Sequence, residues 1–229
     1  CSAPQQSGCY ESNLIPKIWL ITVNSNLVVW YNICNQLSDN TVGSLTQNQK
    51  SLVIGTILGD GYVRIIPRRK NAFLEVNHSI TQRLYVDWKY RTLQSIVKSE
   101  PKLRKGNGTR IAYRFFTQCI PEITNLFHYF YQEKKKMIPN DLAIDPLSIA
   151  VWFMDDGSRS GGSLYLNTQQ FSMQDQKILQ SILLNQFNIH SGLNRDKEYW
   201  RIRIITADAQ KFCSIVRQYI IPSMEYKLV

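Results

Sequence analysis

Acidic residues are scarce in this sequence of 229 residues, because 17 aspartates and glutamates stand against 27 lysines and arginines, for a formal net charge of +10. The basic excess is uneven: the segment before Lys50 contains one lysine, Lys17, and two acidic residues, Glu11 and Asp39. The positive charge on the rest of the chain favours a polyanionic partner. A generally basic protein without such a partner is the alternative that charge alone leaves open.

The sequence also lacks paired cysteines and any long uninterrupted apolar segment. Its five cysteines are scattered, with no CxxC pair and no histidine nearby at the spacing of a zinc site, so they indicate neither a disulfide framework nor a zinc centre and favour a reducing compartment. The most apolar early stretch, residues 15–31, contains Pro16 and Lys17 and is too interrupted to span a bilayer. The polar start predicts no signal peptide. With 44% hydrophobic residues, the chain is expected to be globular.

A diverged internal repeat organises the chain from residue 46 onward. The first copy begins with a capping-box pattern at Thr46, continues as an apolar helix over residues 51–58 and ends in Gly59-Asp60-Gly61. The second begins with Asp145-Pro146, an N-cap acid followed by an N1 proline, continues over 147–154 and ends in Asp155-Asp156-Gly157. The two copies therefore place an acidic turn at equivalent points.

After each acidic turn the same succession of elements follows. Strand-like segments are expected at 62–69 and 164–169, amphipathic helices at 82–97 and 172–186, and further strands at 109–117 and 199–206. A closing helix in each half is expected to end near an Ile-Pro dipeptide, Ile138-Pro139 or Ile221-Pro222. We therefore predict an α+β protein of two pseudo-symmetric αββαββα halves, residues 46–142 and 143–229, preceded by an accessory or loosely ordered extension, residues 1–45.

The two motif helices are apolar on every face, which predicts that each is buried on all sides. Each is the obvious partner of the other, since Gly55, Gly59 and Ala150 would let the backbones approach closely. Parallel packing would bring Asp60 and Asp156 together. Because two close carboxylates repel each other, the arrangement favours a hard cation such as Mg²⁺. A lone Asp-Gly pair is more often a turn or a helix stop, but two at equivalent places favour a function.

These motifs resemble the LAGLIDADG homing endonucleases, and specifically the single-chain organellar type with two motif copies. The matching segments are residues 53–61, 149–157, the Leu-Asn-Thr-Gln at 166–169, the Lys-Met-Ile-Pro-Asn at 136–140 and the closing Tyr-Lys-Leu at 226–228. The resemblance implies antiparallel saddle-shaped sheets and selects Asp60 and Asp156 as catalytic metal ligands. Asp155 occupies the small-residue position that Gly59 holds in the first copy.

The same resemblance implies Mg²⁺, with Mn²⁺ as a substitute, bound by the two carboxylates and by backbone carbonyls at Gly59 and Asp155. It implies lysines near each site, Lys136 and Lys227, for which solvated surface lysines are the alternative. It also implies a monomer without an obligate protein partner, located in a mitochondrion or chloroplast and not in a membrane. His78, His128 and His190 are scattered and isolated, and we interpret them as structural.

The polar faces of the strands are the expected surface for double-stranded DNA, because a β-ribbon fits the major groove and long polar side chains reach base edges. Alternation places Trp200, Ile202 and Ile204 on the packed face. Basic residues expected in turns between strands are predicted to bind phosphates rather than read bases, and they are Lys70, Arg104, Lys105, Arg110, Arg159, Arg195 and Lys197. Simple wetting of polar faces is the alternative for each position. The DNA-binding candidates are Arg64, Arg68, Arg69, Lys70, Glu75, Asn77, Arg104, Lys105, Arg110, Arg114, Arg159, Asn167, Gln169, Arg195, Lys197, Arg201 and Arg203.

Three functions compete on this pattern. The first is a site-specific endonuclease that cuts both DNA strands at one long asymmetric site, the reaction of intron homing. The second is a maturase that binds its own intron RNA and assists splicing, with or without DNA cleavage. The third is a DNA-binding regulator without catalysis. Retention of both Asp60 and Asp156 favours the endonuclease, because neither of the others needs both carboxylates.

Overall fold

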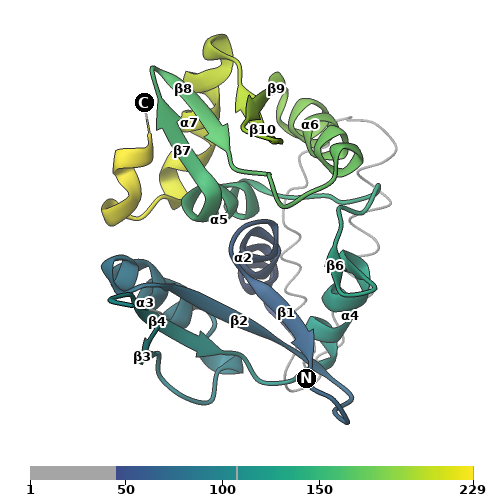
Figure 1. Cartoon of the computed structure of the whole chain (residues 1–229), viewed down its shortest axis with the longest axis vertical. Coiled ribbons are helices and arrows are strands. Elements are labelled where there is room, and N and C mark those ends of the chain that lie inside the picture. The colour runs from purple at the N-terminus through teal and green to yellow at the C-terminus, as the bar shows by residue number, and fades with distance from the viewer. Residues whose placement is uncertain (1–44, 107, 229) are drawn as a thin grey trace, which may run out of the picture. The chain divides into compact units, whose positions relative to one another are not determined.

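The computed structural model describes residues 45–106 and 108–228. The extension expected at 1–45 therefore lies outside the described residues except for its last residue, and three of the five cysteines lie outside them as well. In the described part the protein is a mixed α+β structure with two four-stranded antiparallel sheets, as predicted. Figure 1 shows these sheets on either side of two central helices. Cys119 and Cys213, the cysteines that the structure describes, are both free. None of the described helices is long and apolar enough to cross a membrane.

The central helices are α2 (Gln47–Leu58) and α5 (Pro146–Asp156), and among the helices of the described residues these two pack on each other most extensively. The predicted caps are present at both N-termini. Thr46 and Gln49 form a reciprocal capping box, and the Asp145 side chain accepts a hydrogen bond from the Ser148 backbone N–H. Both helices are buried nearly throughout because each is covered by the other and by its own half. They form the centre of one continuous core.

The two sheets have the same strand order. The first is β1-β2-β4-β3 and the second is β7-β8-β10-β9. The strands of the first sheet are β1 (Tyr62–Ile65), β2 (Ala72–Ser79), β3 (Lys102–Lys105) and β4 (Ile111–Phe116). Those of the second are β7 (Gly157–Ser160), β8 (Ser163–Leu166), β9 (Ser191–Asp196) and β10 (Tyr199–Ile204). Tyr62 pairs with Glu75 in the first sheet as Ser158 pairs with Tyr165 in the second, so the repeat extends to the strand register.

Further helices cover the sheets in each half. They are α3 (Arg83–Thr92) and α4 (Pro121–Phe130) in the first half, and α6 (Met173–Phe187) and α7 (Ala209–Val216) in the second. Short 3-10 turns complete the described part, at Ile80–Gln82, Gln94–Ile96, Thr206–Asp208, Arg217–Tyr219 and Pro222–Lys227. The second half follows the predicted order to its end, where α7 and the turn after it precede Ile221-Pro222.

Three details of the prediction are wrong. The closing helix of the first half ends at Phe130, well before Ile138-Pro139, because the hairpin of β5 (Tyr131–Gln132) and β6 (Lys135–Lys136) reverses the chain. Its turn uses left-handed backbone at Glu133 and Lys134. The strand expected at 62–69 stops at Ile65, since the next residues form a turn in which Arg68 has a φ of 68°. Trp200, expected on the packed face, is 37% exposed.

Candidate active site

Two glycines of α2 set the close approach of the central helices. A Cβ atom added to Gly55 would lie 2.4 Å from the Ser148 carbonyl oxygen and 2.7 Å from the Val151 Cβ. One added to Gly59 would lie 2.4 Å from the Asp155 Cβ. Small residues on α2 therefore pack against larger ones on α5. This packing brings the C-terminal ends of the two helices together, as the motifs predict.

Asp60 and Asp156 lie at these two helix ends. Asp156 is the last residue of α5, and Asp60 follows Gly59, the C-cap of α2. Both line one open cavity of about 1290 Å³, whose wall also includes Lys136 and Asn167. Gln170 links the two ends, because its side-chain amide lies 3.3 Å from the Gly59 carbonyl oxygen and 3.4 Å from Asp156 Oδ2. The structure thus brings the two predicted carboxylates to a common, solvent-accessible space.

The environment of this pair disfavours two negative charges. Burial raises the pKa of Asp156 to about 8, and repulsion from Asp60 and Asp155 adds to the shift. Burial and then repulsion from Asp155 also raise the pKa of Asp60, although half of the Asp60 side chain is exposed. A bound cation would offset this repulsion and favour the charged form of both carboxylates.

Lys136 and Lys227 contact the same helix ends and are not solvated surface lysines. The Lys136 ammonium donates to the carbonyl oxygens of Gly59 and Gly61, at 3.0 and 3.1 Å. The Lys227 ammonium lies 2.5 Å from the Met154 carbonyl oxygen and 3.3 Å from that of Asp155. Burial lowers the pKa of Lys136 to about 8 and also lowers the pKa of Lys227. Each lysine therefore contacts the end of one motif helix beside one carboxylate.

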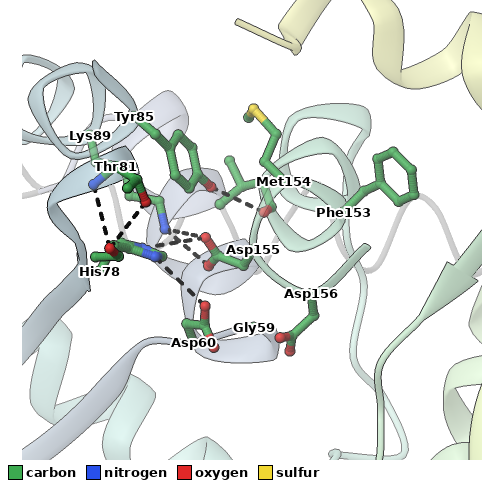
Figure 2. A network of polar contacts seen from close by, with 12 residues as sticks. Gly59, Asp60, His78, Thr81, Tyr85, Lys89, Phe153, Met154, Asp155 and Asp156 are labelled. Carbon is green, nitrogen blue, oxygen red and sulfur yellow. Dashed lines mark hydrogen bonds and ion pairs between the residues drawn. The ribbon is translucent and has the colours of Figure 1, made fainter. Parts of the chain in front are cut away.

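A buried polar network beside Asp60 was missed from the sequence. Asp155 forms an ion pair with Lys89 of α3 at 2.7 Å, and both side chains are fully buried. His78 of β2 lies 3.6 Å from Asp155 and 3.6 Å from Asp60, and burial lowers its pKa to about 4, so the imidazole is neutral at pH 7. Figure 2 shows this imidazole between the two carboxylates.

The prediction that the histidines are isolated is therefore wrong for His78. It is also wrong for His190, whose ring lies 2.8 Å from Asp208. Asp155 was expected to act through its backbone rather than its side chain, but its side chain has a buried partner. The one local signal was the position of Lys89 four residues after Tyr85, on the face of α3 that turns out to be buried.

The side chains present fit a magnesium site of the kind completed by water and substrate. Among the described residues no group of three or more His, Cys, Asp or Glu side chains is placed to hold a metal ion. Mg²⁺ commonly uses only one or two carboxylates, keeps several waters and binds substrate phosphate. Asp60 and Asp156 supply two carboxylates in an open cavity, and the expected carbonyls of Gly59 and Asp155 lie at the same helix ends.

The DNA-binding candidates are distributed over the strands and turns of both sheets. On the first sheet Glu75 lies between Arg64 and Arg114, at 3.3 Å from each. On the second, Arg201 contacts Asn167 at 3.3 Å and covers the ring of Tyr165. Asn77 and Arg203 also lie on strands. The prediction of turn positions is wrong for four basic residues, which lie on β3, β7 and β9 because these strands extend to the hairpin turns: Arg104, Lys105, Arg159 and Arg195. Turn or loop positions are Arg68, Arg69, Lys70, Arg110, Gln169 and Lys197.

Arg159 and Gln169 are further candidates with partners within the chain. Arg159 was expected to reach for phosphate, but its guanidinium donates to the Leu228 carbonyl oxygen at 3.0 Å. The Gln169 amide donates to Asp196 at 2.9 Å. These contacts hold both side chains in defined orientations at the sheet surface.

Comparison with known proteins connects this geometry to a family. Residues 50–212 match the model of the LAGLIDADG DNA endonuclease family. A "Probable intron-encoded endonuclease 1" of Wickerhamomyces canadensis is 32% identical over 200 residues, which cover 81% of this chain and 86% of the relative. The "Cytochrome b mRNA maturase bI2" of Debaryomyces hansenii is 26% identical over 240 aligned positions, covering 95% of this chain and 87% of the relative.

Among solved structures, the homing endonuclease I-WcaI bound to its DNA recognition sequence matches with a TM-score of 0.76 and 32% identity. The match covers 91% of this chain and 95% of that one.

Proposed function

Because the chain belongs to the LAGLIDADG DNA endonuclease family, we propose that it is a site-specific endonuclease that cuts both strands of double-stranded DNA in intron homing. The observation that carries the proposal is the placement of Asp60 and Asp156 at adjacent helix ends, opening into one cavity and each flanked by a lysine. The solved relative bound to its DNA recognition sequence supports DNA as the substrate. One carboxylate from each half fits one cut in each strand.

In this proposal Asp60 and Asp156 hold Mg²⁺, for which Mn²⁺ can substitute, with help from the carbonyls of Gly59 and Asp155. When bound there, the metal supplies an activated water and offsets the charge that develops on the phosphate. Lys136 and Lys227 fix the carbonyls at the helix ends and add positive charge beside the reacting phosphates. The open cavity admits the DNA backbone to both carboxylates.

Target recognition is assigned to the outward polar residues of the two sheets. Paired groups such as Arg201 with Asn167, and Arg114 with Glu75, are already oriented by contacts within the chain. Side chains held in this way lose less conformational freedom when they bind base edges. Because the lysines and arginines in the turns bind phosphates, affinity is expected to fall steeply as salt rises.

The two halves, residues 46–142 and 143–229, supply one sheet and one carboxylate each, so a monomer is sufficient to cut an asymmetric site. We place the protein in a mitochondrion or chloroplast, in line with relatives named for intron-encoded endonuclease and cytochrome b mRNA maturase.

The second candidate is an RNA maturase, favoured by the likeness to the Debaryomyces hansenii maturase along 95% of this chain. Its partner would be the intron RNA that encodes it. The two functions differ in their need for the carboxylates, since RNA binding requires neither Asp60 nor Asp156. Cleavage is therefore the discriminating measurement.

The test uses plasmid DNA that carries the intron-lacking allele of the host gene, incubated with purified full-length protein and Mg²⁺. The unmodified protein is expected to linearise it. Asp60→Asn and Asp156→Asn are each expected to slow cleavage by at least about a thousandfold, because metal-assisted charge stabilisation contributes several kcal/mol. Asp141→Asn, an exposed acid outside the cavity, is the matched control. No cleavage by the unmodified protein, or undiminished cleavage by the two variants, refutes the proposal.

A further inference from the structure

We propose that His78 is a positioning residue for Asp60, and that the cut made at Asp60 depends on a buried network which Asp156 lacks. This inference rests on the proposed nuclease function and deepens it. It predicts that the two hydrolytic centres are not equivalent, although the fold around them is repeated.

The contacts of His78 explain how it orients Asp60. Nδ1 of the imidazole lies 3.6 Å from Asp60 Oδ2, and Nε2 lies 3.6 Å from Asp155 Oδ1. The His78 side chain is only 3% exposed, and its ring packs against Tyr85 with centroids 5.3 Å apart. An imidazole that is buried, packed on its face against Tyr85 and turned with Nε2 toward Asp155 presents Nδ1 in a fixed direction, toward the Asp60 carboxylate.

Asp155 in turn is held by Lys89. The ammonium lies 2.7 Å from Asp155 Oδ1 and 2.9 Å from Oδ2, so it contacts both oxygens. Both side chains are fully buried, and a buried ion pair with good geometry leaves little room for alternative rotamers. A series of side-chain contacts therefore runs from α3 through α5 and β2 to the cavity, as Figure 2 shows. Its members, in order, are Lys89, Asp155, His78 and Asp60.

The second half has no such network at the equivalent positions. His78 lies three residues after Glu75, and the residue three after the equivalent Tyr165 is Thr168. Thr168 is fully buried, bonding Gln176 and the Ile202 backbone N–H rather than Asp156. Lys89, seven residues after the N-cap of α3, corresponds to Leu179, seven after the N-cap of α6.

The acid of the network, Asp155, also has no counterpart in the first motif copy. Asp155 precedes Asp156 in the second copy, whereas Gly59 precedes Asp60 in the first. Asp156 instead has the side-chain amide of Gln170 at 3.4 Å from its Oδ2, and Gln170 is an exposed residue. One carboxylate is therefore oriented by a buried, ion-paired network and the other by a solvent-accessible amide.

The test measures the two strands separately. A duplex containing the target site carries a different end label on each strand and is cut under single-turnover conditions by the full-length protein. For His78→Ala we expect one strand to slow by about 10- to 100-fold more than the other, the usual cost of removing a residue that orients a metal ligand. Nicked duplex is then expected to accumulate.

Two conservative variants separate the contacts of the ring. His78→Asn keeps an amide where Nδ1 faces Asp60, and it is expected to restore the ratio of the two strand rates toward that of the unmodified protein. His78→Gln keeps an amide where Nε2 faces Asp155 and is expected to give the same skewed ratio as His78→Ala. This variant also decides the matter if His78→Ala does not fold.

Val76→Ala is the matched control, since Val76 is a fully buried residue on the same face of β2, two positions before His78. It lowers stability without touching either carboxylate and is expected to leave the ratio unchanged. Equal slowing of both strands by every His78 variant, or equal ratios for His78→Asn and His78→Gln, overturns the inference. Failure of the unmodified protein to cut either strand would instead refute the proposed function.

Discussion

The two halves of the described part have the same backbone plan but surround their carboxylates differently. Both have the same strand order, matching register, an apolar motif helix and a lysine that binds its end. Around Asp60 the first half places a buried histidine next to an ion pair. In the second half Asp156 is itself more deeply buried, and its neighbour is the amide of the exposed residue Gln170. Duplication has preserved the frame that positions the acids, while the side chains that tune them have diverged.

The largest expected difference between the halves concerns Lys89. Lys89→Met leaves Asp155 buried without its cation and is expected to lower the free energy of unfolding by about 3–5 kcal/mol. Leu179→Met at the equivalent position of α6 is a near volume-conserving change and should cost less than about 1.5 kcal/mol. Urea unfolding monitored by circular dichroism measures both.

The double variant Lys89→Met with Asp155→Ala sharpens this comparison. Removal of both side chains leaves no unpaired buried charge, so most of the lost stability should return. If Lys89→Met and Leu179→Met cost the same, the buried ion pair is not the feature that distinguishes the halves.

The network also shows where sequence reasoning reached its limit. The central helices were predictable because Thr46 and Asp145 are strong N-caps and the residues after them are uniformly apolar. Asp60 and Asp156 could be paired because the repeat makes them equivalent. Lys89 and Asp155, by contrast, lie 66 positions apart in the chain. No periodicity or local motif indicates which lysine meets which acid across a core.

The hairpin of β5 and β6 was missed for a different physical reason. Its residues are mainly polar, so they carry no apolar periodicity, and its turn depends on left-handed backbone at Glu133 and Lys134, neither of which is a residue type that signals such a turn. The hairpin nevertheless delivers Lys136 to the carbonyls beside Asp60. Polar connections of this kind become visible only when their hydrogen bonds are known.

The second prediction concerns the interface, where Gly55 of one half faces Val151 of the other. Gly55→Ala is expected to cost about 1–3 kcal/mol, since its Cβ would overlap the Ser148 carbonyl oxygen as well as Val151. Gly192→Ala in β9, where a Cβ meets nothing within 4 Å, should change stability by less than about 0.5 kcal/mol. Thermal unfolding of both variants checks this, and equal shifts would show that close helix packing at Gly55 contributes nothing.

The third prediction compares how much Lys227 and Lys136 each contribute to the free energy of unfolding. Lys227→Met leaves buried helix-end carbonyls without their donor and is expected to cost about 1–3 kcal/mol. Lys136→Met should cost less, because the Lys136 residue is only partly buried and water can reach the carbonyls of Gly59 and Gly61. Chemical unfolding with unchanged m-values would measure the two losses. The reverse order would contradict the deeper burial of the Lys227 end.

The fourth prediction concerns a difference in pH dependence, measured without metal in the presence of a chelator. The pKa of Asp156 is raised from 3.8 to about 8 in the folded protein, so between these values the folded state binds more protons than the unfolded state. Its contribution to stability is therefore fully present below pH 4 and is lost as pH rises toward 8. Asp156→Asn removes this loss, so its stability relative to the unmodified protein should rise with pH across that window.

The slope of that rise is at most about 1.4 kcal/mol per pH unit, and solvent screening reduces it. His78, whose pKa is lowered to about 4, acts in the opposite direction below pH 6.5, but it is present in both proteins and cancels in the difference. Asp60→Asn should give a shallower slope, because half of the Asp60 side chain is exposed to water. A flat difference for Asp156→Asn, or a steeper one for Asp60→Asn, would contradict the assignment of the more strongly desolvated carboxylate to the second half.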